Sequence, residues 1–322
     1  MIKIDKTTFK ILSELDFDAR ESITDISKKI LLSKKGTEYR IKELENNGTI
    51  IRYYPIIDFF RLGFKYNRVW IKLAHTNAEI RKEIEKKFIE NPYVNVAFWV
   101  DGEYDLGMTF WTRTEKEFLD RLRQLCSDLS PYYLTRQITK IVSLYQYNYP
   151  FAAKRKRMLI QETSDLQEID ILDYKILSEL NKNARMSATQ IASNIKSNYK
   201  TVIYRIKELE KKKILVGYRA NIDFNKVGYH YAKVFFKIKQ DTVKLKEFFN
   251  YIDSLKEVFY AIDQIGEYDI DIEIFNKDEN AFYEFMDMIA EKYSNIIITT
   301  YKILFRKNIK LSYLPYMKEF EK

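Results

Sequence analysis

The chain contains two copies of one sequence pattern, and this constrains its fold more than any other feature. Residues 4–63 align without a gap on residues 169–228, and about 27 of the 60 aligned positions are identical. A fixed internal period of this kind indicates repeated structural units. Three runs recur: Ile11–Leu15 as Ile176–Leu180, Tyr39–Glu45 as Tyr204–Glu210, and Gly102–Asp105 as Gly266–Asp269. The sequence therefore predicts a tandem duplication.

Each half changes its hydrophobic period once, which predicts two small domains per half. The first part of each half has apolar residues at helical spacing, and the second part contains strand-like alternation. The basic run Lys154–Arg157 lies in the stretch that connects the halves, and we interpret it as a solvated tether or, beside DNA, as a phosphate contact. The expected boundaries are helical domains at 1–63 and 169–228, strand-and-helix domains at 64–149 and 229–316, and a linker at 150–168.

The helical part of each half predicts three short helices that begin at side-chain caps. A short polar side chain before an apolar-periodic stretch accepts hydrogen bonds from the free N–H groups of the first turn. The second helix is short, and the third follows it after a tight turn. The predicted caps are Asp5, Ser22 and Ser33 in the first copy and Asp170, Ser187 and Asn198 in the second.

The third helix of each copy presents polar and cationic side chains on the face opposite its apolar residues. A capped helix behind a short helix and a turn is the geometry that enters a DNA major groove. The alternative is an amphipathic helix whose polar face meets only water. Extended stretches at 50–57 and 215–222 favour the DNA-binding interpretation, because they read as the wings of winged helices. The predicted DNA-binding residues are Ser33, Lys34, Lys35, Thr37, Arg40, Arg52, Asn198, Tyr199, Lys200, Thr201, Arg205 and Arg219.

Two of these residues also have a competing interpretation. Arg40 and Arg205 occupy equivalent positions, and either DNA contact or ion pairing inside their own domain would account for them. Arg52 and Arg219 lie in the predicted wings, where an arginine reaches a phosphate.

The second part of each half predicts a βαββαβ order. In the first half, Val69, Ile71 and Leu73 alternate with Arg68, Trp70 and Lys72, which is typical of a strand with one buried face. This order closes a four-stranded antiparallel sheet with two helices on one face, a ferredoxin-like sandwich. The fold class is thus α+β, with two winged helix-turn-helix domains, each followed by such a sandwich. The tryptophans on the strands indicate that the other sheet face is an association surface.

Composition excludes several classes of protein. The 322 residues include 55 Lys and Arg against 46 Asp and Glu, a formal charge of +9 that makes nucleic acid a candidate partner. The eight glycines form no nucleotide-binding motif, and a single cysteine, Cys126, supplies neither a disulfide nor a metal site. No apolar run is long enough for a membrane span. We expect a cytoplasmic protein without cofactor, metal or membrane.

The residues also carry a resemblance to a known family. The Asp-x4-Lys-Ile-Leu and Ala-Arg-x-Ser motifs, the ending Arg-Ile-x-x-Leu-Glu of the third helix, and then Ile57-Asp58 and Gly63 resemble the Lrp/AsnC family of transcriptional regulators. The resemblance covers both halves and implies a regulator that binds double-stranded DNA. The second copy departs from the first at Lys213, which replaces Gly48. This predicts either a differently placed second wing or a different helix end.

The recurring Gly-Glu-Tyr-Asp runs connect the two central strands of each sandwich. A hairpin turn that needs glycine at positive φ explains them without any function. The resemblance implies a second role, because in this family a small effector, often an amino acid, lies near this corner. The candidate effector-binding residues are Gly102, Tyr104, Asp105, Gly266, Tyr268 and Asp269.

Two other functions compete with DNA binding. The first is that of the sirohaem decarboxylases. These enzymes have a similar two-domain architecture, and they depend on histidine and arginine in the sandwich domain. His75 and His230 fall at non-equivalent points of the repeat, so we predict no catalytic residue and no enzyme. The second is RNA binding through Phe98, Phe110 and Trp111 on a sheet, although Asp271 and Glu273 stand in the second copy where cations are expected.

The duplication also predicts the assembly. In the resembled family a dimer presents two equivalent helix-turn-helix domains, so one chain of this protein equals one covalent pseudo-dimer. The two recognition helices differ, with Lys34, Gly36 and Glu38 matched by Tyr199, Thr201 and Ile203. Two different half-sites are therefore expected in the DNA. We also expect dimers or tetramers of the chain, and halves that stay paired after a cut near Thr163.

Overall fold

The fold repeats one order of elements in each half, as the duplication predicts. The computed structural model describes residues 4–239 and 241–320. The first half contains α1 (Lys6–Glu14), α2 (Ile23–Ile30), α3 (Lys34–Asn46), β1 (Ile50–Ile57), β2 (Lys65–Leu73), α4 (Ala78–Glu90), β3 (Val94–Asp101), β4 (Leu106–Thr112), α5 (Glu115–Asp128) and β5 (Tyr133–Tyr147). After β6 (Arg157–Gln161), the second half contains α6 (Ile171–Lys182), α7 (Ala188–Asn194), α8 (Tyr199–Lys211), β7 (Leu215–Ile222), β8 (His230–Ile238), α9 (Thr242–Ser254), β9 (Val258–Ile265), β10 (Ile270–Asn276), α10 (Glu279–Tyr293) and β11 (Ile297–Leu311).

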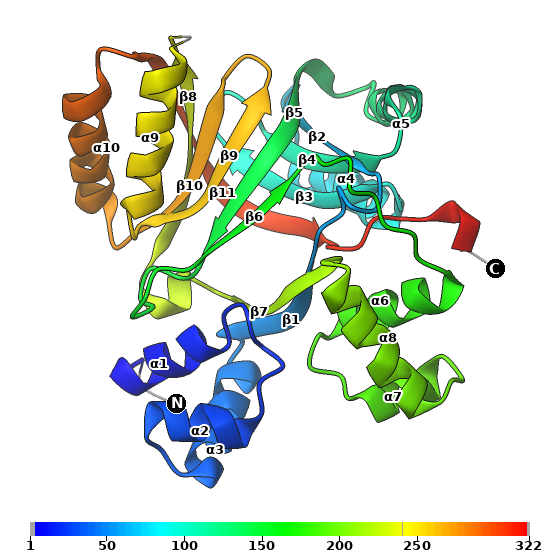
Figure 1. The fold of residues 1–322 in the computed structure, drawn as a ribbon. Helices are drawn as coiled ribbons and strands as arrows, with labels where there is room; N and C mark the ends of the chain where they lie inside the picture. The colour runs from blue at the N-terminus through cyan, green and yellow to red at the C-terminus, as the bar shows by residue number, and fades with distance from the viewer. Residues whose placement is uncertain (1–3, 240, 321–322) are drawn as a thin grey trace.

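The six helices of the two helical domains begin where the sequence predicts. We call α1–α3 the first head and α6–α8 the second head; both lie on the same side of the sheet (Figure 1). The side chain of Ser33 accepts a hydrogen bond from the Gly36 amide, and that of Asn198 accepts one from the Lys200 amide. The other four predicted caps accept hydrogen bonds in the same way. These hydrogen bonds satisfy N–H groups that the helix itself leaves free.

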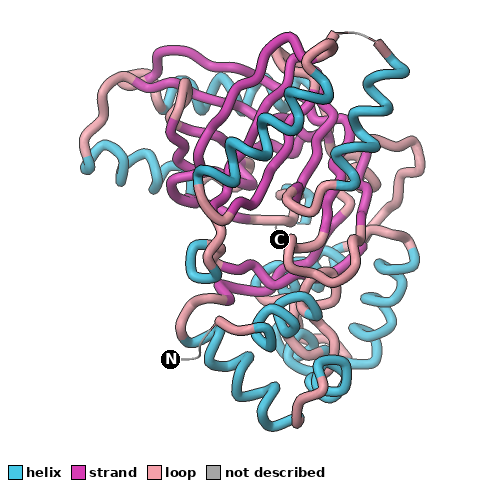
Figure 2. Tube along the Cα trace, turned by 90° about the vertical axis from the view of Figure 1, so that its left-hand side faces the viewer, coloured by secondary structure: helices cyan, strands magenta, loops and turns pink. Residues whose placement is uncertain are grey.

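The strands of both halves close into one barrel. Within each half the sheet order is β5-β2-β4-β3 or β11-β8-β10-β9, as a ferredoxin-like order requires. The 15-residue strands β5 and β11 then continue into the other half, where β5 pairs with β9 and β11 pairs with β3. The eight strands therefore form a closed ring, with the four helices of the sandwiches outside it (Figure 2).

The barrel interior is the association surface that the aromatic residues of the strands predict. Trp70 is 1% exposed and packs with Phe98 of its own half and Phe235 of the other half. Trp99 lies on the helix side, where its indole N–H donates to Glu85. The predicted RNA-binding rings Phe98, Phe110 and Trp111 are all buried. They are not available to stack on bases, so this sheet does not offer the RNA-binding surface considered from the sequence.

The predicted wings pair with each other. Strands β1 and β7 form a two-stranded antiparallel ribbon, in which Arg52 is the register partner of Asn221. The outer edge of β7 bonds to the first head, since the Ala19 amide donates to Tyr218 O and the Tyr218 amide donates to Phe17 O. The ribbon lies between the heads and the barrel in Figure 1. The ribbon therefore joins the two halves, because β1 of the first half pairs with β7 of the second and β7 also bonds to the first head.

The expected linker contains a strand. Residues 157–161 form β6, which pairs with the end of β5. Of the basic run, Arg155 stacks on the Tyr147 ring at 3.9 Å and Arg157 forms an ion pair with Asp253 of α9 at 3.0 Å. Arg155 also donates to the Asp253 carbonyl at 3.3 Å, so both arginines attach the segment to the second sandwich and are not part of a free tether.

Candidate nucleic-acid interface

The N-terminal turns of α3 and α8 present exposed hydrogen-bonding and cationic groups. Ser33, Lys34 and Lys35 are exposed in the first head. At the matching positions, Asn198, Tyr199 and Lys200 are exposed in the second head, and Thr201 is half-buried. Polar groups at the start of the second helix of a helix-turn-helix unit are those that reach base edges and phosphates.

Thr37 does not belong to this surface. Its side chain is fully buried, and its hydroxyl donates to the Ser33 carbonyl at 3.0 Å. The repeat contained the signal that was missed, because Thr37 aligns with Val202, which is also fully buried. The DNA-binding prediction for Thr37 is therefore wrong: a threonine that bonds the carbonyl four residues earlier fits an apolar helix face.

Arg40 and Arg205 take the competing role, pairing inside their own heads. Arg40 lies 3.0 Å from Asp5, the cap of α1, and Arg205 lies 2.9 Å from Asp170, the cap of α6. The backbone N–H of Thr8 and the Arg40 guanidinium lower the pKa of Asp5. These pairs hold the first helix of each head against its recognition helix, and direct DNA contact by either arginine, whose side chains stay 27% and 33% exposed, remains a prediction.

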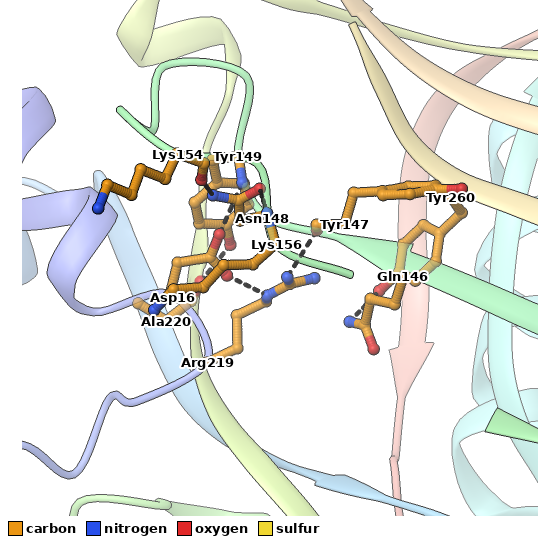
Figure 3. Close-up of polar contacts among 10 residues, drawn as sticks. All are labelled: Asp16, Gln146, Tyr147, Asn148, Tyr149, Lys154, Lys156, Arg219, Ala220 and Tyr260. Carbon is orange, nitrogen blue, oxygen red and sulfur yellow. Dashed lines mark hydrogen bonds and ion pairs between the residues drawn. The ribbon is translucent and has the colours of Figure 1, made fainter. Parts of the chain in front are cut away.

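Arg219 is also turned away from DNA. It is fully buried, its Nε donates to Asp16 of the first head, and its Nη2 donates to the Tyr147 carbonyl at 2.8 Å (Figure 3). Asp16 in turn accepts a hydrogen bond from the Tyr149 amide at 2.6 Å. The side chain ties β7 to the first head and to the end of β5, which corrects the phosphate-contact prediction.

Arg52 turns inward as well. Its guanidinium lies over the Tyr313 ring at 5.2 Å and over the Tyr54 ring at 5.9 Å, and its Nε and Nη2 atoms are buried without a hydrogen-bond partner. The alternation of the strand did not reveal this orientation, because Tyr313, whose ring Arg52 contacts, is far from it in the sequence. The prediction that Arg52 contacts phosphate is therefore wrong.

Two arginines that the sequence analysis did not select fix the heads relative to each other. Arg20 donates to the Ala184 and Met186 carbonyls of the second head, the latter at 2.9 Å. Its repeat equivalent, Arg185, donates to the Ala19 carbonyl of the first head. Both belong to the recurring Ala-Arg-x-Ser motif, so the recurrence of an arginine at a helix-connecting turn was the available signal. The contacts hold the two recognition helices in one arrangement.

The two Gly-Glu-Tyr-Asp corners come together in the structure. Tyr104 and Tyr268 are buried in one apolar cluster, and the Tyr301 ring lies 6.4 Å from the first and 6.2 Å from the second. The Asp105 carboxylate accepts a hydrogen bond from the Leu73 amide at 2.8 Å, and Asp269 accepts one from the Ile238 amide at the same distance. Both carboxylates thus stabilise the turn.

The glycines of the two corners differ in conformation. Gly102 has φ +145°, and a Cβ atom built on it would lie 2.5 Å from the Tyr301 hydroxyl oxygen. Gly266 is not among the glycines with positive φ. The positive φ expected from the sequence therefore holds for the first corner alone.

The described residues contain no further candidate for a metal or membrane site. Over residues 4–239 and 241–320, no three His, Cys, Asp or Glu side chains gather as a metal ion would require. No helix in the same part of the chain combines the length and the apolar character needed to cross a bilayer.

The fold and the exposed helix surfaces define a duplicated helix-turn-helix protein, and the comparison with known sequences agrees. The family model for winged helix-turn-helix DNA-binding domains matches residues 4–51 and 169–216. An uncharacterised HTH-type transcriptional regulator of Pyrococcus furiosus is 36% identical over 103 residues, which are 32% of this chain and 69% of that protein. The regulator LrpA of Pyrococcus horikoshii is 31% identical over 116 residues, 36% of this chain and 79% of that protein. The chain therefore belongs to the Lrp/AsnC family of transcriptional regulators.

A solved structure extends the likeness to the whole chain. The sirohaem decarboxylase NirDL aligns with 98% of this chain and 96% of its own, with a TM-score of 0.62 and 13% sequence identity. At this identity the likeness concerns the fold, and one fold serves many functions.

Proposed function

We propose that the chain binds double-stranded DNA selectively, as a covalent pseudo-dimer whose α3 and α8 enter two successive major grooves. The observation that carries this proposal is the pair of capped helices with exposed lysines, held in one arrangement by Arg20, Arg185 and the ribbon. Two heads fixed on one body suit two half-sites on one side of a duplex. A cytoplasmic location follows from this role.

The two heads differ, so the proposed target contains two unlike half-sites. At matching exposed positions of the two recognition helices, the first head has Lys34 where the second has Tyr199, and Glu38 where the second has Ile203. A cation and a carboxylate favour different base edges from those that an aromatic and an aliphatic side chain contact. Symmetric dimers favour palindromes, and this chain lacks their symmetry.

Replacing Lys35 and Lys200 with alanine tests the groove assignment. Each phosphate contact contributes about 0.9 to the slope of log affinity against log salt, so the double variant should bind more weakly and its slope should fall by about two. The measurement is DNA binding by fluorescence anisotropy between low and physiological salt.

The matched control replaces Lys82 of α4 and Lys246 of α9, two exposed lysines on the outer helices. It removes the same charge away from the heads, and its slope should stay near that of the unaltered protein. An equal loss in both double variants would mean that α3 and α8 do not contact DNA.

We also propose that an effector such as an amino acid modulates DNA binding at the paired corners, which dimers or tetramers of the chain would enclose further. The support is that Gly102, Tyr104 and Tyr268 converge around Tyr301. We propose that the chain is not an enzyme. The competing decarboxylase function would be favoured by a haem-like absorption band in the purified protein.

A further inference from the structure

A cavity of about 560 Å³ lies between the β1–β7 ribbon and the end of the barrel. Its volume is in the range of pockets that take drug-sized ligands. Residues from both ribbon strands and from every barrel strand line it, so it belongs to neither half alone. It is distinct from the paired corners, because none of the Gly-Glu-Tyr-Asp residues lines it.

The cavity wall is rich in aromatic rings. Phe59 stacks on Trp111 at 4.5 Å, and Phe224 stacks on Phe275 at 3.8 Å. Such a wall binds a planar ring through offset or edge contacts that favour aromatic over aliphatic groups. The other lining rings are Tyr54, Tyr66, Phe98, Tyr149, Tyr231, Phe259, Tyr260, Phe305 and Tyr313.

Hydrogen-bond donors without a partner gather on one face of the ribbon. Arg52 and Asn221 are register partners, and Arg219 stands two residues before Asn221, so the three side chains share a face. Arg52 Nε and Nη2, Asn221 Nδ2 and Arg219 Nη1 are buried with no acceptor. Asn221 and Tyr54 of the same face line the cavity, whereas Arg52 and Arg219 are not among its lining residues. In Figure 3 the unpaired nitrogen of Arg219 points toward Gln146 and Tyr260, which also line it.

Two charged residues at the cavity have no ion-pair partner among the described residues: Arg52, and Asp223 of the wall, whose carboxylate accepts from the Asn225 amide at 3.1 Å. The buried acids are each paired: Asp16 with Arg219, Asp271 with Arg68 and Lys233, and Glu273 with Lys233. Arg52 forms no ion pair among the described residues. Burying an unpaired cation and several unpaired donors costs free energy unless an acceptor meets them. Trp111 adds a further donor, since its buried indole N–H lacks a partner in the cavity wall.

We propose that this cavity binds an aromatic carboxylate, with the carboxylate against Asn221, on the ribbon face that Arg52 and Arg219 share, and the ring among the aromatic residues. Arg219 also holds Asp16 of the first head, and the ribbon holds both heads. A ligand here would therefore bias the arrangement of the heads; this consequence, unlike the binding itself, rests on the proposed function.

The test measures binding of 2-naphthoate to the full chain without DNA, by calorimetry. Two comparison probes separate the contributions: 2-naphthamide keeps the rings without the charge, and cyclohexanecarboxylate keeps the charge without the rings. We expect 2-naphthoate to bind at least tenfold more tightly than 2-naphthamide, because a charge-assisted hydrogen bond contributes about 1.5–3 kcal/mol and 1.4 kcal/mol is tenfold. We expect it to bind about two- to tenfold more tightly than cyclohexanecarboxylate, because aromatic pairs contribute about 0.5–1.5 kcal/mol.

Arg52→Met should lower the affinity for 2-naphthoate about tenfold and leave that for 2-naphthamide unchanged. Arg123→Met, an exposed arginine on α5, is the matched control and should change neither. If Arg52→Met does not fold, Asn221→Asp introduces a repelling carboxylate at nearly constant shape, with exposed Asn250→Asp of α9 as its control. Absence of 2-naphthoate binding, equal binding of 2-naphthamide, or an equal loss in a control variant would overturn the proposal. Because no DNA is present, failure of the DNA-binding proposal leaves this result unaffected.

Discussion

At the scale of residues, the barrel interior holds a charge cluster that the two halves share unequally. Arg68 and Lys233 are repeat equivalents on β2 and β8, but both acids come from the second half, on β10. Burial raises the pKa of Glu273 to about 7, against the opposing effect of Arg68. Burial, together with Arg68, lowers the pKa of Lys233 to about 7. The Tyr231 hydroxyl also donates to Glu273.

Glu273→Gln should change the pH dependence of stability. Between the ordinary glutamate pKa and about 7, the folded protein holds one proton more than the unfolded chain, so Glu273 lowers stability as the pH rises. The glutamine variant lacks this titration. Its free energy of unfolding relative to the unaltered protein should therefore rise by about 2 kcal/mol from pH 5 to pH 7.

Urea unfolding at several pH values measures this difference. Glu284→Gln, on the exposed face of α10, is the control and should show no such trend. A constant difference between Glu273→Gln and the unaltered protein across the range would show that Glu273 stays ionised in the fold.

Some residues of the candidate site could be predicted and others could not. Helix caps depend on a few neighbouring residues, and all six proved correct. The exposed lysines at the helix starts followed from the same periodicity. Arg219 was misassigned because its partner Asp16 lies 203 positions away, and no local pattern links the two residues. Arg52 was misassigned because Tyr313, whose ring it contacts, is far from it in the sequence.

At the scale of elements, the recognition helices end alike although their sequences differ there. Gly48 has φ +70° and Lys213 has φ +56°, so the second copy adopts a left-handed residue without glycine. The sequence left open a displaced wing or another helix end, and the structure shows neither. Lys213 of the second copy instead adopts a strained, left-handed backbone conformation.

Lys213→Gly should stabilise the protein by about 0.5–1 kcal/mol. A left-handed conformation costs a non-glycine residue roughly 1–2 kcal/mol, and the greater freedom of glycine in the unfolded chain cancels about half of the gain. Thermal unfolding followed by circular dichroism checks this. The reciprocal variant Gly48→Ala should destabilise the protein, and a loss of stability in Lys213→Gly would contradict the account of strain.

The element types were predictable where periodicity was strong, but their partners were not. The βαββαβ order of each half follows from alternating strands and capped helices. Strands β5 and β11 are 15 residues long because the far end of each strand pairs with a strand of the other half. Likewise, β1 and β7 read as separate wings, since pairing over such separations is invisible to local propensity.

At the scale of the whole molecule, the two halves are joined by strands rather than by the linker. Three pairings connect them: β1 with β7, β3 with β11, and β5 with β9. The sequence predicted paired halves on one chain; it did not predict that their sheets would merge at the edges into one barrel. The two halves are therefore held together mainly by noncovalent strand pairings within one chain.

Cutting the chain at Thr163 should leave one particle. A protease site placed there lies after β6 and before α6, outside the pairings that join the halves. We expect both fragments to elute together at submicromolar concentration, because separating them would expose the barrel interior and break the three pairings. Native mass spectrometry should find one copy of each fragment. Homodimers of single halves would contradict the pseudo-dimer.

The closed ring of strands also limits how copies of the chain can adhere. Each of the eight barrel strands has neighbours on both sides, so none offers a row of unpaired backbone groups to a foreign strand. Strand β6, appended outside the ring, is five residues long and begins at the exposed Arg157. A short edge strand with a charged residue, such as β6, is a poor template for fibrils. Crowding should therefore drive this protein toward side-chain contacts between its outer helices, and not toward amyloid.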